Sequence, residues 1–118
     1  MSPITDRREY CVPIVEHESA PVVLMLPGIF RRTMTDGEKM MLCEVHLAEG
    51  AVLTSHTHPH EQTGYLISGR MSLKIGDERR RVGPGDAWLV PPDVPHEARA
   101  LEATLVIEVF SPPRDDFR

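Results

Sequence analysis

The sequence is poor in several features that mark specialised classes of protein, beginning with cysteine. Its 118 residues include only Cys11 and Cys43, which are too few for a disulfide framework. In a reducing compartment both are expected to be thiols that pack as small hydrophobic side chains. The most apolar stretch, residues 20–30, is too short to span a bilayer and contains two prolines. We therefore expect a soluble protein without disulfide bonds.

Basic residues are also scarce, with 13 Lys and Arg against 18 Asp and Glu and a formal net charge of -5. A nucleic-acid-binding protein needs a basic surface to contact phosphates. The most basic run, Arg79, Arg80 and Arg81, is interpreted as a solvated turn. The polar start MSPITDRREY lacks the apolar segment of a signal peptide. These features predict a cytoplasmic protein that binds neither nucleic acid nor membranes.

Helical periodicity and internal repeats are missing as well. Eleven prolines and eight glycines separate short runs in which apolar and polar residues alternate, as in residues 41–47. We expect eight or nine strands between about residues 22 and 110, forming an antiparallel sandwich or barrel. Residues 96–105 have a helical composition, but ten residues make a marginal helix and the flanks favour strands. One domain (21–118) would follow an N-terminal arm (1–20) that adds an edge strand or reaches a partner subunit.

Three of the six histidines lie close together in TSHTHPHEQTGYLISG, residues 54–69. If this segment begins as a strand, His56 and His58 point to one side, and Gln62 can return its amide oxygen across a turn. His60 would lie in that turn as a bystander. His96 follows the proline-rich PPDVP and is presented at the start of a strand. Exposed loop histidines are the alternative, but this combination favours a metal site.

These motifs resemble those of the cupins. Gly50, His56, His58, Gln62 and Gly69 have the spacing of the first cupin motif, with glutamine in place of the usual glutamate. The second motif is matched by three residues and broken by two: Gly85, Pro91 and His96 match, whereas Asp93 replaces glycine and Ala100 replaces asparagine. The resemblance implies an all-β, antiparallel double-stranded β-helix, or jelly roll. It also implies that His56, His58, Gln62 and His96 hold one divalent transition metal.

Such a ligand set has a chemical consequence. Three neutral imidazoles and a neutral amide leave the ion with its full positive charge, so that it would act first as a Lewis acid. The ligand types suit Ni, Fe, Mn, Zn or Co about equally well.

Further candidate residues have two interpretations each. Gly64 would be a flexible joint in its strand, or would leave room beside the metal for a sugar-sized substrate. Trp88 would pack in the core or line the pocket. Glu108 would be a surface residue or an acid/base in the cavity, and Arg114 a solvated tail residue or part of the barrel rim. His46 shares a polar, outward face with Glu44.

Residues 27–117 resemble, more closely, small cupins of the pectin-degradation KdgF type. The likeness rests on PGIFRRTMTDGEKMML, HTHPHEQTGYLISG and EVFSPPRDDF. It implies conversion of cyclic 4,5-unsaturated uronates to their linear keto form. Glu108, Phe110 and Arg114 correspond to the acid, aromatic residue and arginine that follow in this family; its acid is typically aspartate, so Glu108 is one methylene longer. Arg114 would pair with a substrate carboxylate and Glu108 would move a proton.

Three functions are compatible with these observations. The first is a metal-dependent enzyme that acts on an anionic small molecule, an unsaturated uronate or related sugar acid. The second is a cupin dioxygenase for a small aromatic compound or diketone, and the third a non-catalytic binding or sensor domain. A homodimer is expected in each case, because the arm and the outward apolar strand faces exceed what one small sandwich can cover.

Overall fold

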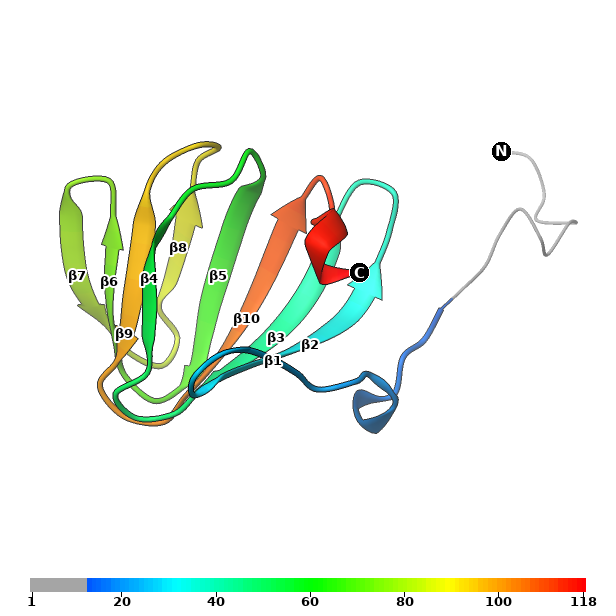
Figure 1. Ribbon diagram of the computed structural model, residues 1–118, viewed down its shortest axis with the longest axis horizontal. Coiled ribbons are helices and arrows are strands. Elements are labelled where there is room, and N and C mark those ends of the chain that lie inside the picture. Colours follow the sequence, from blue (N-terminus) through cyan, green and yellow to red (C-terminus); the bar gives the residue numbers. More distant parts are fainter. Residues whose placement is uncertain (1–12) are drawn as a thin grey trace, which may run out of the picture.

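The computed structural model describes residues 13–118, in which nearly all of the regular secondary structure is β-strand (Figure 1). Two 3-10 turns flank the strands: η1 (His17–Ser19) and η2 (Asp115–Phe117). The ten strands are β1 (Val23–Leu26), β2 (Ile29–Asp36), β3 (Met41–Leu47), β4 (Val52–His56), β5 (Glu61–Ser68), β6 (Met71–Ile75), β7 (Glu78–Val82), β8 (Ala87–Val90), β9 (His96–Ala100) and β10 (Thr104–Ser111).

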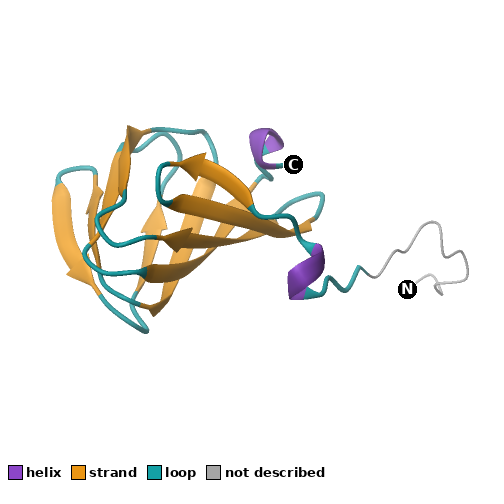
Figure 2. Ribbon diagram, turned by 60° about the horizontal axis from the view of Figure 1, so that its bottom comes forward, coloured by secondary structure: helices purple, strands orange, loops and turns teal. Residues whose placement is uncertain are grey.

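The strands form two antiparallel sheets that face each other (Figure 2). One has six strands in the order β1-β2-β3-β10-β5-β8, and the other has four in the order β4-β9-β6-β7. Alternation along the strands gives each sheet an inner apolar face: Met41, Cys43, Val45 and Leu47 of β3 are buried, while the residues between them turn outward. The fold is thus the all-β jelly roll that the sequence predicts.

The segment with helical composition, residues 96–105, forms β9 and the start of β10. β9 is central in its sheet, between β4 and β6, and β10 lies between β3 and β5. Hydrogen bonds from two neighbouring strands outweigh a helical preference of a few tenths of a kcal/mol per residue. The prediction that these residues are strands is confirmed.

The space between the sheets holds the core. Its buried members come from both sheets: Ile29, Val45, Leu47, Ala51, Leu66, Met71, Leu73, Ala98, Ala100 and Val106. A second, smaller cluster joins Met41 and Cys43 to Phe110 and Phe117. Cys43 is fully buried, and burial raises the pKa of its thiol to about 11, so it packs as a neutral hydrophobic side chain. Cys11 lies outside the described residues.

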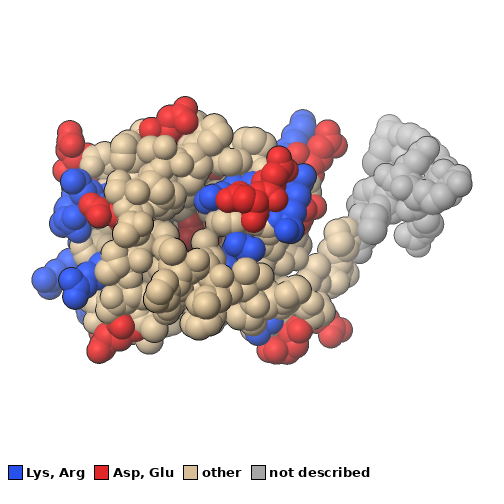
Figure 3. Space-filling view, in the orientation of Figure 1, with Lys and Arg blue, Asp and Glu red and all other residues tan. Residues whose placement is uncertain are grey.

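The interpretation of the arginine run at 79–81 as a turn is wrong. The run forms most of β7, the edge strand of the four-stranded sheet, and the turn comes earlier, at Gly76 and Asp77. Gly76 adopts a φ of 59°, which reverses the chain before the arginines. The three side chains are exposed, and basic groups gather along this side of the molecule (Figure 3). Charges on an edge strand discourage pairing with another chain.

The part of the arm that the structure describes, residues 13–20, contains η1 and no strand. Arg32 of β2 fastens it by donating to the carbonyl oxygens of His17 and Ala20, at 2.9 and 2.7 Å. His17 also reaches Glu44 on the outer face of β3, with 2.8 Å between Nε2 and Oε1. Residues 1–12, the rest of the predicted arm, lie outside the described residues. No helix within residues 13–118 is both long and apolar enough to cross a membrane.

Candidate metal centre

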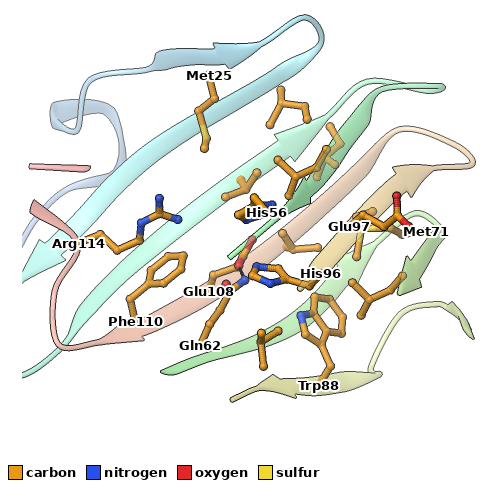
Figure 4. A pocket seen from close by; sticks show the side chains of 18 of the residues that line it. Met25, His56, Gln62, Met71, Trp88, His96, Glu97, Glu108, Phe110 and Arg114 are labelled. Carbon is orange, nitrogen blue, oxygen red and sulfur yellow. Dashed lines mark hydrogen bonds between the residues drawn. The ribbon is translucent and has the colours of Figure 1, made fainter. Parts of the chain in front are cut away.

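Three histidines converge at one end of the space between the sheets. One ring nitrogen from each of His56, His58 and His96 lies within 4.8 Å of the other two. His56 ends β4 and His96 begins β9, and the two are direct register partners, with ring centroids 4.1 Å apart (Figure 4). His58 and His96 are buried, whereas His56 is partly exposed. The pairing of β4 with β9 therefore sets the separation of two of the three rings.

His58 reaches the site by a different route from the one its spacing suggests. β4 ends at His56, so strand alternation does not place His58. It lies in the loop before β5, and its ring is oriented by Nδ1, which donates to the carbonyl oxygen of His60 at 3.0 Å. His60 is not part of the converging group, although its backbone orients a member of it.

The tautomers of the three rings follow from their backbone contacts. Nδ1 of His56 lies 3.0 Å from the oxygen of Thr54, and Nδ1 of His96 lies 2.9 Å from that of Val94. A carbonyl oxygen only accepts hydrogen bonds, so Nδ1 carries the hydrogen in each ring, including His58, and Nε2 keeps its lone pair. Nε2 of His96 is buried without a partner. A cation is the group that three such lone pairs fit.

Gln62 completes the set from the opposite sheet. Its amide nitrogen donates to Glu108, which turns Oε1 toward the histidines, 2.9 Å from Nε2 of His58. With His58 protonated on Nδ1, both atoms of this contact are acceptors. A cation beside two acceptors at that distance would offset their mutual repulsion. The residues present thus fit a divalent transition metal held by three imidazoles and an amide oxygen.

Burial also keeps two of these rings neutral. It lowers the pKa of His96 to about 4 and lowers that of His58 as well, and in both cases it outweighs the hydrogen bonds that favour the charged form. At neutral pH both imidazoles are therefore uncharged, which is the form that binds metals.

Glu108 lies on the inner face of β10, so the cavity interpretation applies. It is the register partner of Gly64 and lies diagonally across from Gln62, whose amide it binds. Burial raises the pKa of its carboxyl to about 7, against the opposing effect of the Arg114 guanidinium. An acid that holds its proton near neutral pH suits general acid/base chemistry.

Phe110 and Arg114 line the same pocket as Glu108. Phe110 is the register partner of Gln62, and its ring centroid is 5.8 Å from that of His58. Arg114, just after β10, lines the same pocket with its guanidinium carbon 5.3 Å from the Phe110 ring. The structure brings the acid, the aromatic ring and the arginine together with His56 and His96, as Figure 4 shows.

Gly64 does not provide the space that the sequence suggested for a substrate. A Cβ at this position would lie 2.3 Å from Cε2 of the Trp88 indole. The missing side chain therefore accommodates Trp88, which both lines the pocket and packs against the core. The sequence does not reveal this, because the pairing of β5 with β8 joins residues 24 positions apart.

The pocket combines this polar group with apolar walls, and from outside it is a hollow with an acidic side chain at its base (Figure 3). Phe117 and Met25 also line it, and the sequence had indicated neither. The only signal for Phe117 was its place at the end of the PPRDDF stretch.

Comparison with known proteins agrees with this geometry. The family model of the cupin domain matches residues 43–110. Over 92 residues the chain is 36% identical to the pectin degradation protein KdgF of Dickeya dadantii (strain 3937), which covers 76% of this chain and 84% of that protein. The chain is a small cupin of the KdgF type. Its fold is similar to that of KdgF from Halomonas sp., with a TM-score of 0.86, 36% identity and coverage of 91% of this chain and 99% of the other. An RmlC-like cupin from Shewanella frigidimarina NCIMB 400 gives a TM-score of 0.84 at 26% identity, covering 87% and 93%.

This cupin departs from the second motif at Asp93, and the structure shows what the motif glycine would do. Asp93 has a φ of 64°, in the left-handed region that glycine enters most easily. It is the third residue of a turn in which Val94 N–H donates to Pro91 oxygen at 3.3 Å, and its own N–H donates to His58 oxygen at 2.9 Å. This turn connects the loop of His58 to the loop before His96, and an aspartate tolerates its conformation.

Proposed function

We propose that this cupin is a metal-dependent enzyme that converts an unsaturated uronate or a related sugar acid, by ring opening and keto–enol isomerisation. One observation carries the proposal: Glu108 and Arg114 line the same pocket as two of the converging histidines, His56 and His96. The likeness to KdgF of Dickeya dadantii, a pectin degradation protein by name, supports the substrate class.

His56, His58, Gln62 and His96 would hold the metal, which supplies Lewis-acid polarisation of a substrate oxygen when bound. The chain's own residues bind and orient the substrate around it. Arg114 pairs with the substrate carboxylate, since a guanidinium matches a carboxylate with two parallel hydrogen bonds. This local cation supports binding of an anion to a protein whose net charge is -5.

Glu108 moves the proton. In the conversion of an enol to its keto form, a carboxylate oxygen of Glu108 accepts the proton of the enol hydroxyl, and the carboxyl then delivers a proton to the neighbouring carbon. No electrons leave the substrate, so the step needs no oxidant. Gln62 holds one oxygen of Glu108 through its amide N–H, which leaves the other oxygen to exchange the proton.

The test is the decay of the 4,5-unsaturated uronate absorbance, with monomer freshly made by a polysaccharide lyase and metal-loaded protein. We expect wild type to accelerate the decay, and Glu108→Gln to lower the rate about 100-fold or more. His56→Ala with His58→Ala should abolish the acceleration. His46→Ala is the matched control, because His46 lies on the outer face of β3.

Two results would count against the proposal. Equal decay with and without metal-loaded wild type would reject the substrate class. Oxygen consumption that accompanies turnover of a small aromatic compound or diketone would favour a dioxygenase instead, since isomerisation consumes none.

A further inference from the structure

The guanidinium of Arg114 is held in a fixed orientation by the residues that follow it. Nε donates to Oδ1 of Asp116 at 3.2 Å, and Nη2 donates to Oδ2 at 2.8 Å. This is a side-on, bidentate pair. The Arg114 side chain is only 15% exposed, while that of Asp116 is 60% exposed. Asp116 therefore approaches the guanidinium from the solvent side.

This contact uses one edge of the guanidinium and leaves another. An arginine has five N–H donors, and the Asp116 pair takes one from Nε and one from Nη2. Within residues 13–118, Nη1 makes no hydrogen bond. The edge formed by Nη1 and the second hydrogen of Nη2 is the one that remains, and it can accept one further carboxylate in bidentate fashion.

Phe117 fixes the plane of the same group. The guanidinium carbon of Arg114 lies 3.9 Å from the centroid of the Phe117 ring. Phe117 is in turn held by β2: its carbonyl oxygen accepts a hydrogen bond of 2.7 Å from the Thr33 hydroxyl. The Arg31 guanidinium lies over the same ring, 4.1 Å from its centroid. The turn η2 is thus anchored to a strand at the edge of the pocket.

The surroundings of Arg31 show what its stacking on the Phe117 ring contributes. Arg31 is 7% exposed, its Nε is buried without a hydrogen-bond partner, and no carboxylate within residues 13–118 forms an ion pair with it. A buried cation without a counter-charge is costly. Within residues 13–118, its contact with the Phe117 ring is a cation–π interaction that offsets part of this cost.

We propose that Asp116 and Phe117 are positioning residues that hold Arg114 with one edge free, so that the pocket accepts a single substrate carboxylate. This inference rests on the proposed function for its substrate class. Asp116 does not compete for the substrate carboxylate, because it occupies a different edge. The last turn of the chain completes the binding site.

The experiment compares two neighbouring carboxylates. Asp116→Asn removes the charge that orients Arg114; Asp115→Asn is the matched control, because Asp115 lies in the same turn but pairs with Arg118 at 2.9 Å. Binding of D-galacturonate to metal-loaded protein is measured by isothermal titration calorimetry, with D-galactose as the probe without a carboxylate. Asp116→Asn should weaken galacturonate binding about 3- to 10-fold, the cost of ordering one long side chain on binding.

The other variants and probes have expected results of their own. Asp115→Asn should bind galacturonate like wild type, and Asp116→Glu should recover part of the affinity lost in Asp116→Asn. Neither Asp115→Asn nor Asp116→Asn should alter galactose binding. Phe117→Leu weakens galacturonate binding in the same direction, with its thermal unfolding curve recorded to confirm that it folds. With the unsaturated uronate, Asp116→Asn raises KM while kcat changes less than about twofold, because Arg114 binds and does not react.

The outcomes separate this inference from the proposed function. If the unsaturated uronate is not converted but Asp116→Asn still weakens galacturonate binding, the proposed function fails and the positioning role stands. Tighter binding by Asp116→Asn would show that Asp116 is an internal competitor and would overturn the role. Equal effects of the two aspartate variants, or no binding of galacturonate to wild type, would overturn it too.

Discussion

Gly64 and Trp88 are register partners on β5 and β8, and the indole occupies the space above the glycine. Any Cβ on residue 64 would therefore displace the tryptophan from the pocket. Gly64→Ala should lower the free energy of unfolding by about 1–3 kcal/mol, as overpacking does. It should also shift the emission of Trp88, the single tryptophan of the chain. Denaturant unfolding monitored by tryptophan fluorescence measures both the free energy of unfolding and the emission of Trp88. The control is Gly83→Ala, where a Cβ meets its nearest atom only at 4.0 Å; equal behaviour of the two variants would disprove the close packing.

The converging lone pairs predict that the protein as purified carries one divalent transition metal per chain. Removal with a chelator should lower the melting temperature, because a ligand that binds only the folded state, at 100 times its Kd, stabilises it by about 2.7 kcal/mol. Elemental analysis gives the stoichiometry, and thermal unfolding gives the shift. His96→Ala should lose both the metal and the chelator effect, whereas His46→Ala should keep them. A full metal content in His96→Ala would contradict the ligand set.

The left-handed backbone of Asp93 predicts different effects on stability for two substitutions there. Asp93→Gly relieves the strain but adds freedom to the unfolded chain, so its stability should stay close to that of wild type. Asp93→Val should cost about 1–3 kcal/mol, because a β-branched residue at a φ of 64° is strained. Urea unfolding distinguishes the two. Similar curves for the glycine and valine variants would show that the turn relaxes.

The contact of the arm with the barrel should depend on pH. Hydrogen bonds from Glu44 and then Glu18 raise the pKa of His17, with Arg32 opposing them. Burial raises the pKa of Glu44, but the hydrogen bonds of His17 and His46 outweigh it and lower the pKa overall. The raised histidine pKa contributes stability that is fully present below 6.5 and is lost as the pH rises through the folded value. The lowered pKa of Glu44 contributes stability that is fully present above pH 4.5 and is lost as the pH falls through the folded pKa.

The contact should therefore be strongest between about pH 5 and 6. His17→Gln should lower the melting temperature most in that window and least near pH 8. A difference between variant and wild type that does not change from pH 5 to 8 would rule out the ionic contact.

We propose that the outer face of the six-stranded sheet joins two copies of the chain. It exposes Tyr65, Ile67 and Leu89 by 47, 41 and 53%, an apolar patch that a second copy related by a twofold axis would cover. A standard interface buries roughly 800 Å² per partner. Light scattering should give a dimer, and Leu89→Arg a monomer. Val52→Arg, at an exposed apolar residue of the other sheet, should remain dimeric. A monomeric wild type would refute the interface.

Much of the fold could be predicted because its signals are local. Alternation along residues 41–47 identifies one face of a strand, and the histidine and glutamine spacings indicate a candidate metal site without knowledge of strand pairing. What the sequence missed depends on contacts between distant segments. The indole over Gly64 comes from the β5–β8 pairing, and Phe117 enters the pocket because Thr33 and Arg31 of β2 hold it. Strand alternation does not explain the position of His58, because a hydrogen bond in the loop after β4 orients its ring.

The ligand set draws on both layers of the jelly roll. His56 and His96 belong to the four-stranded sheet, while Gln62 belongs to the six-stranded one. An ion coordinated by all of them would cross-link the two sheets at the mouth of the barrel, where no backbone hydrogen bonds of the strand ladders join one sheet to the other. The sheets could then separate at this end only after ligands dissociate from the ion. Amide hydrogen exchange near His96 and Gln62 would slow in concert on metal loading, and the rate at which the mouth opens would become a property of the ion as much as of the strands.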